Sequence, residues 1–267
     1  MWSSTAVRID RDAAVDGMPE GLDGSVAVEM GSPWSRSLDL LLPVLNAPMG
    51  GVAGGRLAAA VSAAGGLGMV GVGSTGSVER LEREVAEAGT GGRRFGIGLP
   101  DWAISRHPEL VDAALQSSPM LLAVSFGDDW KWTERVRRAG IVTVTQVATV
   151  DEAERAAGAG VDVLVARGAE GRGHGTPAVG TLPLLDGVLD RVSVPVLAAG
   201  GITTARGLAA VLAAGASGAW IGTAFAACTE SLVPAEVRRA LIGASVDPVP
   251  PCSPTPTRRM PDRESAP

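Results

Sequence analysis

The chain has 267 residues, of which 46% are hydrophobic and 19% are charged, and its formal net charge at pH 7 is −6. This composition supports a large buried core and argues against a disordered chain. The acidic balance argues against nucleic-acid binding, which needs a basic stripe, and leaves small molecules as the expected partners.

The two cysteines, Cys228 and Cys252, are too few for a disulfide framework, and no CxxC motif or Cys/His cluster indicates a zinc site. The first residues, MWSSTAVRIDRDAAVDG, carry acids where a signal peptide would be apolar. We therefore expect a reduced, cytoplasmic protein that binds no metal.

Eight short apolar runs predict buried strands. In chain order they are residues 43–47, 68–72, 94–99, 120–126, 141–147, 162–166, 194–199 and 218–222. Helical stretches separate them, for example at 78–89, 132–140 and 150–160, and a last helix is expected near 234–242. Apolar strands that alternate with helices indicate a parallel sheet covered on both faces. Eight such units in about 200 residues predict an α/β protein with a single (β/α)8 TIM barrel.

Three segments, 57–73, 152–168 and 208–224, repeat the order of Ala-rich helix, glycine and apolar strand. Two uncharged stretches that overlap them, 57–78 and 207–229, have about the length of a membrane span. Because glycines interrupt both stretches, we expect each to form a helix, a turn and a strand, and we expect no membrane segment.

The ends of the chain do not follow the repeat. Residues 1–38 are weakly periodic and are expected to form an N-terminal extension at the bottom of the barrel, which itself takes up residues 39–246. Residues 247–267 are Pro-rich and polar and are expected to be a disordered tail. The barrel would then have only a short C-terminal region after its eighth unit.

A competing fold is suggested by GVGSTG at residues 71–76, which matches GxGxxG between a predicted strand and a predicted helix. Asp101 follows the next strand, where a ribose-binding acid would lie in a dinucleotide-binding domain. The match is weak evidence in a chain with 36 glycines. A βα unit also precedes it, whereas the fingerprint usually marks the first strand.

In a (β/α)8 barrel, functional residues gather at the carboxyl ends of the strands. The seventh strand ends in AAGGITT (198–204) and the eighth in IGTA (221–224). Glycines allow a ligand to approach the backbone, and free N–H groups favour an anion. These two neighbouring strand ends therefore predict a phosphate-binding cradle.

The sixth strand leads into ARGAEGRGHGT (166–176), which holds His174, one of only two histidines. Histidine transfers protons near neutral pH, and the surrounding glycines leave room for a ligand, so His174 is the candidate catalytic base. The first strand ends in NAPMGG (46–51). Met49 is as well explained by a core position as by contact with a flat ligand.

Five motifs in this order resemble those of the nitronate monooxygenase family, also called 2-nitropropane dioxygenase-like, which includes flavin-dependent enoyl-ACP reductases. They are APM at the first strand end, AAAVSAAGGLG after it, GAEGRGH at the sixth, LAAGGI at the seventh and WIGTAF near the eighth. The resemblance extends from about residue 43 to residue 231.

The resemblance implies an FMN-dependent oxidoreductase that oxidises alkyl nitronates or nitroalkanes with O2, with His174 as the base. The residues that it implies for FMN binding are Ala47, Pro48, Met49, Gln146, Gly173, Gly200, Gly201, Gly222 and Thr223. Two alternatives stay open: an NAD(P)H-dependent reductase of the enoyl-ACP reductase type, and a flavin-binding barrel with little activity. The sequence indicates no oligomeric state.

The chain also departs from the family pattern QGxEAGGHxG. Arg167 stands in place of the glutamine, Gly171-Arg172 in place of Ala-Gly, and Thr176 in place of the last glycine. The third strand carries Gly98 where many members have asparagine. Arg167 and Arg172 are therefore candidates either for attracting an anionic nitronate or for solvated surface charges.

Overall fold

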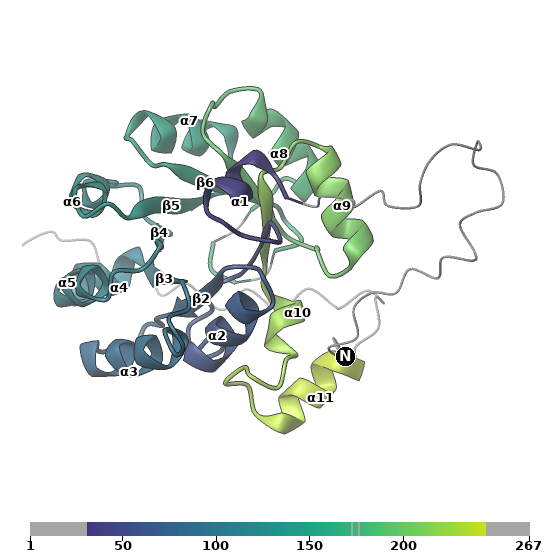
Figure 1. Ribbon diagram of the computed structural model, residues 1–267. Coiled ribbons are helices and arrows are strands. Elements are labelled where there is room, and N and C mark those ends of the chain that lie inside the picture. Colours follow the sequence, from purple (N-terminus) through teal and green to yellow (C-terminus); the bar gives the residue numbers. More distant parts are fainter. Residues whose placement is uncertain (1–30, 172, 176, 244–267) are drawn as a thin grey trace, which may run out of the picture.

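Eight parallel strands form the centre of the structure, a computed structural model that describes residues 31–171, 173–175 and 177–243 (Figure 1). The strands are β1 (Val44–Asn46), β2 (Gly68–Gly71), β3 (Phe95–Pro100), β4 (Leu121–Ser125), β5 (Val142–Val147), β6 (Val163–Arg167), β7 (Val196–Ala199) and β8 (Gly218–Ile221). Each pairs with its neighbour in the order β1-β8-β7-β6-β5-β4-β3-β2. The prediction of a single-domain (β/α)8 TIM barrel is confirmed, and the dinucleotide-binding alternative at GVGSTG is wrong.

Helices alternate with the strands and surround them (Figure 1). They are α1 (Pro33–Ser37), α2 (Gly55–Ala63), α3 (Val78–Ala88), α4 (Asp101–Arg106), α5 (Glu109–Gln116), α6 (Trp132–Arg138), α7 (Val150–Gly158), α8 (Thr181–Leu189), α9 (Ala205–Ala213), α10 (Thr223–Ala226) and α11 (Ala235–Gly243). The helical stretches predicted from the sequence do not include α1, α4, α5, α8 or α10.

The strands are buried on both faces, as continuous apolar runs predict. Every residue of β3, β4, β6 and β7 is buried. One apolar cluster fills the inside of the barrel with side chains from alternate strand positions, including Leu45, Met69 and Trp220. Two larger clusters lie between the strands and the surrounding helices. The strand ends are thus held by packing from inside and outside.

Trp34 of α1 belongs to the inner cluster and is 9% exposed. Its neighbours in that cluster include Met120 and Val142, which lie at the amino ends of β4 and β5. The side chain therefore closes the end of the barrel opposite the strand carboxyl ends. The predicted tail 247–267 and residues 1–30 of the predicted extension lie outside the described residues, so the segment boundaries stay a prediction.

The barrel closes between its first and second strands through a side chain. β1 and β2 share one parallel bridge, between Leu45 and Leu67. Beyond it, the buried amide of Asn46 takes the place of a backbone ladder: Nδ2 donates to the carbonyl oxygen of Met69 (2.9 Å), and Oδ1 accepts from the Met69 N–H (2.8 Å). Asn46 thus satisfies two backbone groups that burial would otherwise leave unpaired.

Neither long uncharged stretch forms a single apolar helix. Residues 57–78 contain the end of α2, a turn and β2, and residues 207–229 contain part of α9, a turn, β8 and α10. Within the described part of the chain, no helix has the length and hydropathy that crossing a membrane requires.

Replacement of Asn46 by leucine tests the closure. Asn46→Leu leaves the N–H and carbonyl of Met69 buried without partners, at a cost of about 1–3 kcal/mol for each group. We expect a loss of at least about 2 kcal/mol in the free energy of unfolding, measured by urea titration. Ser77→Ala, which removes an exposed helix cap on Arg80 N, is the milder control, at about 1 kcal/mol. Equal urea midpoints for Asn46→Leu and the wild type would contradict this account.

Candidate active site

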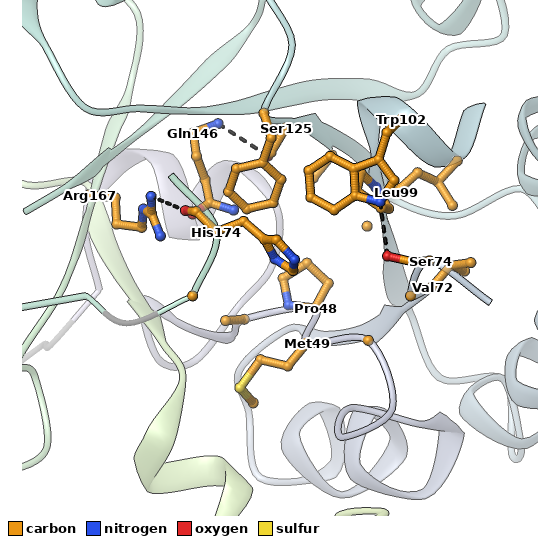
Figure 2. Close-up of a pocket in the computed structure, with 18 residues that line it drawn as sticks. Pro48, Met49, Val72, Ser74, Leu99, Trp102, Ser125, Gln146, Arg167 and His174 are labelled. Carbon is orange, nitrogen blue, oxygen red and sulfur yellow. Dashed lines mark hydrogen bonds between the residues drawn. The ribbon is translucent and has the colours of Figure 1, made fainter. Parts of the chain in front are cut away.

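A cavity of about 350 Å³ opens at the carboxyl ends of strands β1 to β6 (Figure 2). This is where barrels carry their functional residues, and the volume lies within the range of small-molecule sites. Six of the predicted site residues line it: Ala47, Pro48, Met49, Gln146, Gly173 and His174. Sequence regions more than 120 residues apart therefore meet at this cavity.

The segment after β1 forms one wall of the cavity. The Ala47 N–H donates to the carbonyl of Ile221 in β8 (2.7 Å), and the Met49 N–H donates to the carbonyl of Ala47 (2.9 Å). Pro48 then lies against β3, where a Cβ on Gly98 would be 2.2 Å from the Pro48 Cγ. Gly98 thus has a packing reason in this chain, because any side chain there would displace Pro48.

His174 lies in an aromatic group on the opposite wall. The His174 ring lies beside that of Trp102 (Figure 2), with 4.6 Å between the ring centroids. The His174 centroid is 5.6 Å from that of Phe126, and the rings of Trp102 and Phe126 stack with centroids 5.3 Å apart. Trp102 is fixed by a hydrogen bond from its Nε1 to Ser74 Oγ (3.0 Å). The imidazole is exposed, and two flat aromatic surfaces at the cavity flank it.

Phe126 follows the last residue of β4 and has a left-handed backbone conformation, with φ +75°. This region is unfavourable for a bulky side chain, and such strain is characteristic of functional sites. The ring is 38% exposed and lines the cavity. The strained backbone therefore directs an aromatic surface into the site.

Arg167, the last residue of β6, is buried at 7% exposure and lines the cavity. Its guanidinium donates from Nη2 to the backbone carbonyl of His174 (Figure 2). The guanidinium also lies over the ring of Phe126, 5.6 Å from the centroid. Burial lowers the pKa of Arg167, and the charge of Glu152 acts in the opposite direction. Arg167 is thus an internal cation and not a solvated surface charge. Arg172 and Thr176 lie outside the described residues.

A polar contact ties the loop after β6 to the next helix. Glu170 Oε2 accepts from the Thr181 N–H (2.9 Å) and hydroxyl (2.8 Å). The same hydroxyl lies 3.1 Å from the carbonyl oxygen of Gly200, after β7. Partial burial raises the pKa of Glu170, but hydrogen bonds from its own N–H and from Thr181 outweigh it, and the net pKa is lowered. The ionised carboxylate therefore fixes the loop that carries His174.

The four residues of the predicted cradle, Gly200, Gly201, Gly222 and Thr223, lie after β7 and β8 and do not line the cavity itself. Gly200 and Gly201 have φ of +117° and +67°, which favours glycine. Among the described residues, no chain acceptor takes the N–H of Gly201, Gly222 or Thr223. A Cβ on Gly222 would lie 3.6 Å from Met49 Sδ, so the cradle adjoins the cavity wall.

A model of the nitronate monooxygenase family matches residues 34–92 and 105–258. The chain belongs to this family. It is 34% identical over 260 residues to a nitronate monooxygenase from Pseudomonas aeruginosa, covering 79% of this chain and 73% of that protein. The family resemblance of the sequence motifs is thereby confirmed.

Two further similarities extend the range of the family. The chain is 36% identical over 197 residues to a (3aS,4S,5R,7aS)-5-hydroxy-7a-methyl-1-oxo-octahydro-1H-indene-4-carboxyl-CoA dehydrogenase from Rhodococcus jostii, covering 73% of this chain but only 55% of that protein. FabK from Thermotoga maritima has a similar solved structure, with a TM-score of 0.75, 30% identity and coverage of 81% and 69% of the two chains. The relatives named nitronate monooxygenase and dehydrogenase are oxidoreductases.

Trp102, Phe126 and the buried setting of Arg167 are not among the site residues expected from the sequence. Phe126 is the final residue of the predicted strand 120–126, and Trp102 comes two residues after β3. Aromatic residues make up only 3% of the chain, so an aromatic side chain at a strand end is a notable signal. Applying the strand-end rule to the third and fourth strands would therefore have found Trp102 and Phe126.

The contact between Glu170 and Thr181 predicts a pH-dependent stability. Thr181→Val removes the hydroxyl, and we expect a loss of about 1–2 kcal/mol in the free energy of unfolding at neutral pH. Because the folded pKa of Glu170 is lowered, its contribution is present above its unfolded pKa and is lost as the pH falls through the folded pKa. The effect of Thr181→Val should therefore shrink in urea titrations at decreasing pH.

Thr133→Val is the matched control for Thr181→Val. Thr133 is also buried, but its hydroxyl donates to the carbonyl of Trp130 (2.7 Å), with no carboxylate involved. Its effect on unfolding should not change over the same pH range. A pH-independent effect of Thr181→Val would mean that Glu170 does not stabilise the loop.

Proposed function

We propose that this protein is an FMN-dependent oxidoreductase that oxidises alkyl nitronates or nitroalkanes with O2. The observation that carries the proposal is the meeting of two parts at one end of the barrel. One is a cavity with His174 on its wall, and the other is a glycine cradle whose N–H groups have no acceptor among the described residues. Membership of the nitronate monooxygenase family supports the same assignment. In line with the cysteine content, we propose a cytoplasmic location.

The residues present fit FMN. The N–H groups of Gly201, Gly222 and Thr223 would hold the phosphate, because no residue in the described ranges accepts from them and they lie at the strand ends where barrels bind phosphate. The flat ring system would lie against Ala47, Pro48 and Met49, with Gln146 and Gly173 at its edge. Bound FMN would accept electrons from the substrate and deliver them to O2.

His174 acts on the proton of the substrate. A neutral nitroalkane must lose the proton on the carbon that bears the nitro group, and the imidazole accepts it. A nitronate has already lost that proton. Trp102 and Phe126 contact the ring, and these contacts would help the imidazole to keep its orientation toward the substrate.

A second candidate function has support from one relative. The similarity to the carboxyl-CoA dehydrogenase favours a thioester as substrate. A flavin enzyme of the enoyl-ACP reductase type would reduce the C=C bond of an enoyl thioester with NAD(P)H. Anaerobic titration separates the candidates, because NADPH or NADH should bleach the flavin of a reductase quickly. A flavin-binding barrel with little activity would be bleached neither by NAD(P)H nor by a nitronate.

The proposed function predicts a yellow protein that consumes O2 when an alkyl nitronate is added. His174→Ala should lower kcat/KM for a neutral nitroalkane by about 10²–10⁴-fold, the usual contribution of a positioned base, and affect nitronate oxidation far less. The measurement is O2 uptake with the two forms of one nitroalkane. His107→Ala is the control, because His107 is the other histidine and forms an exposed pair with Glu109. A colourless protein that FMN cannot restore would rule out the proposal.

Gly222→Val tests the position of the cradle. Gly222 has φ −98°, so a side chain there causes no left-handed strain, and its Cβ would meet only Met49 Sδ at 3.6 Å and Ala47 Cβ at 3.9 Å. We expect a folded protein whose FMN affinity is at least about tenfold weaker, equivalent to about 1.4 kcal/mol of lost contact. Flavin fluorescence measures the affinity. Gly158→Val, where a Cβ meets no atom within 4 Å, should retain FMN, and equal affinities in both variants would place the phosphate elsewhere.

A further inference from the structure

Arg167 is a buried cation to which the described part of the chain offers no acidic partner. Only 7% of the residue is exposed, and arginine is rarely buried to this extent unless it is paired. Among the residues that the structure describes, no carboxylate forms an ion pair with its guanidinium. The same residues form eight ion pairs elsewhere, and seven of these involve a surface arginine or lysine. The positive charge inside the cavity is therefore not neutralised within the described chain.

Two acidic side chains, one whose charge acts on Arg167 and one close to it in sequence, are committed to other groups. Glu152, whose charge acts on Arg167, accepts from the Ala148 N–H at the start of α7 (2.7 Å). Glu170, three residues after Arg167, accepts from the N–H and hydroxyl of Thr181. A guanidinium is protonated at any physiological pH, so Arg167 keeps its charge.

The guanidinium is held in place by uncharged groups. Nη2 donates to the carbonyl of His174, and the ring of Phe126 lies below the cation. The loop after β6 wraps closely around the side chain: a Cβ would lie 2.9 Å from Arg167 Cγ at Gly171 and 2.8 Å from Nη2 at Gly175. One of the five guanidinium donors thus has a described acceptor, and the side chain is fixed at the wall of the cavity.

We propose that Arg167 determines specificity by binding the negative charge of the substrate. The cavity then selects ligands whose charge is delocalised over two oxygens, such as a nitronate or a carboxylate. Neutral molecules of the same shape bind more weakly. A planar guanidinium matches such an oxygen pair with two parallel hydrogen bonds. Burial of the side chain reduces screening by solvent, so the attraction of the guanidinium for an anion is stronger than at the surface. The catalytic consequence rests on the proposed function, but the anion site does not.

With this assignment, two residues of the site have separate roles toward the substrate. His174 removes a proton from a neutral nitroalkane, whereas Arg167 binds the form from which the proton is already gone. Because Arg167 also holds the His174 carbonyl, its replacement has two effects that an experiment must separate: loss of the charge, and release of the loop.

Binding of propionate and propionamide separates the two effects, because these probes have the same shape and differ in charge. In Arg167→Gln, propionate should bind about thirty-fold or more weakly, as expected for the loss of one partner of a buried charge pair, and propionamide should bind as in the wild type. Arg167→Lys keeps the charge and should retain most of the propionate affinity. Arg191→Gln removes a surface arginine that pairs with Glu154 and is the charge-matched control.

Two optical signals report binding. In the FMN-loaded protein, ligands are followed by the change in flavin absorbance. Without FMN, they are followed by tryptophan fluorescence, since Trp102 lines the cavity. If the protein does not bind FMN but still prefers propionate, and this preference depends on Arg167, the proposed function is rejected and the anion site is retained. Nitronate oxidation by an FMN-loaded Arg167→Gln variant at wild-type KM would reject the anion site alone.

Three further outcomes would overturn the proposal. The first is that the wild type binds propionate and propionamide equally well. The second is that Arg167→Gln and Arg167→Lys weaken the binding of both probes equally, which would mean that Arg167 only supports the loop. The third is that Arg167→Gln loses FMN but keeps the preference for propionate, which would mean that the cation pairs with the cofactor. Urea titration of each variant verifies that the protein is folded.

Discussion

The geometry of this site depends on the closure of the barrel between β1 and β2. Eight parallel strands bring their carboxyl ends to one rim only if the sheet closes, and here a single backbone bridge and the Asn46 amide complete the closure. The next residue in the chain is Ala47, the start of the cavity wall. One buried side-chain amide therefore links the stability of the fold to the position of the first functional segment.

Around this rim, glycines and polar contacts have different structural roles. Glycines allow close approach: Gly98 admits Pro48, and Gly222 leaves the cradle open beside Met49. Polar contacts fix what the glycines would leave loose, and Glu170 with Thr181 holds the loop of His174 to α8 and β7. The site is thus built from a rigid wall after β1 and a tethered loop after β6.

Much of this structure follows from local sequence patterns. Eight short apolar runs predict the eight strands, and the strand-end rule brings His174 and the Ala47–Met49 segment to one cavity. Both predictions depend only on the direction of the chain and on the spacing of its apolar residues. The burial of Arg167 and the stacking of Trp102 on Phe126 depend on which strands become neighbours, so no single segment encodes them. The GxGxxG match at residues 71–76 misleads for the same reason, since glycine spacing alone does not define the sheet around it.

The backbone of Phe126 has a consequence for how this fold can change. A bulky residue in the left-handed region costs about 1–3 kcal/mol relative to a relaxed conformation, and glycine would avoid that cost. The chain therefore retains, at the cavity wall, a residue that a selection for stability alone would remove. Replacing Phe126 with glycine to raise thermostability would increase the free energy of unfolding. It would also remove the aromatic surface beside the imidazole, so stability would be gained at the expense of ligand contact.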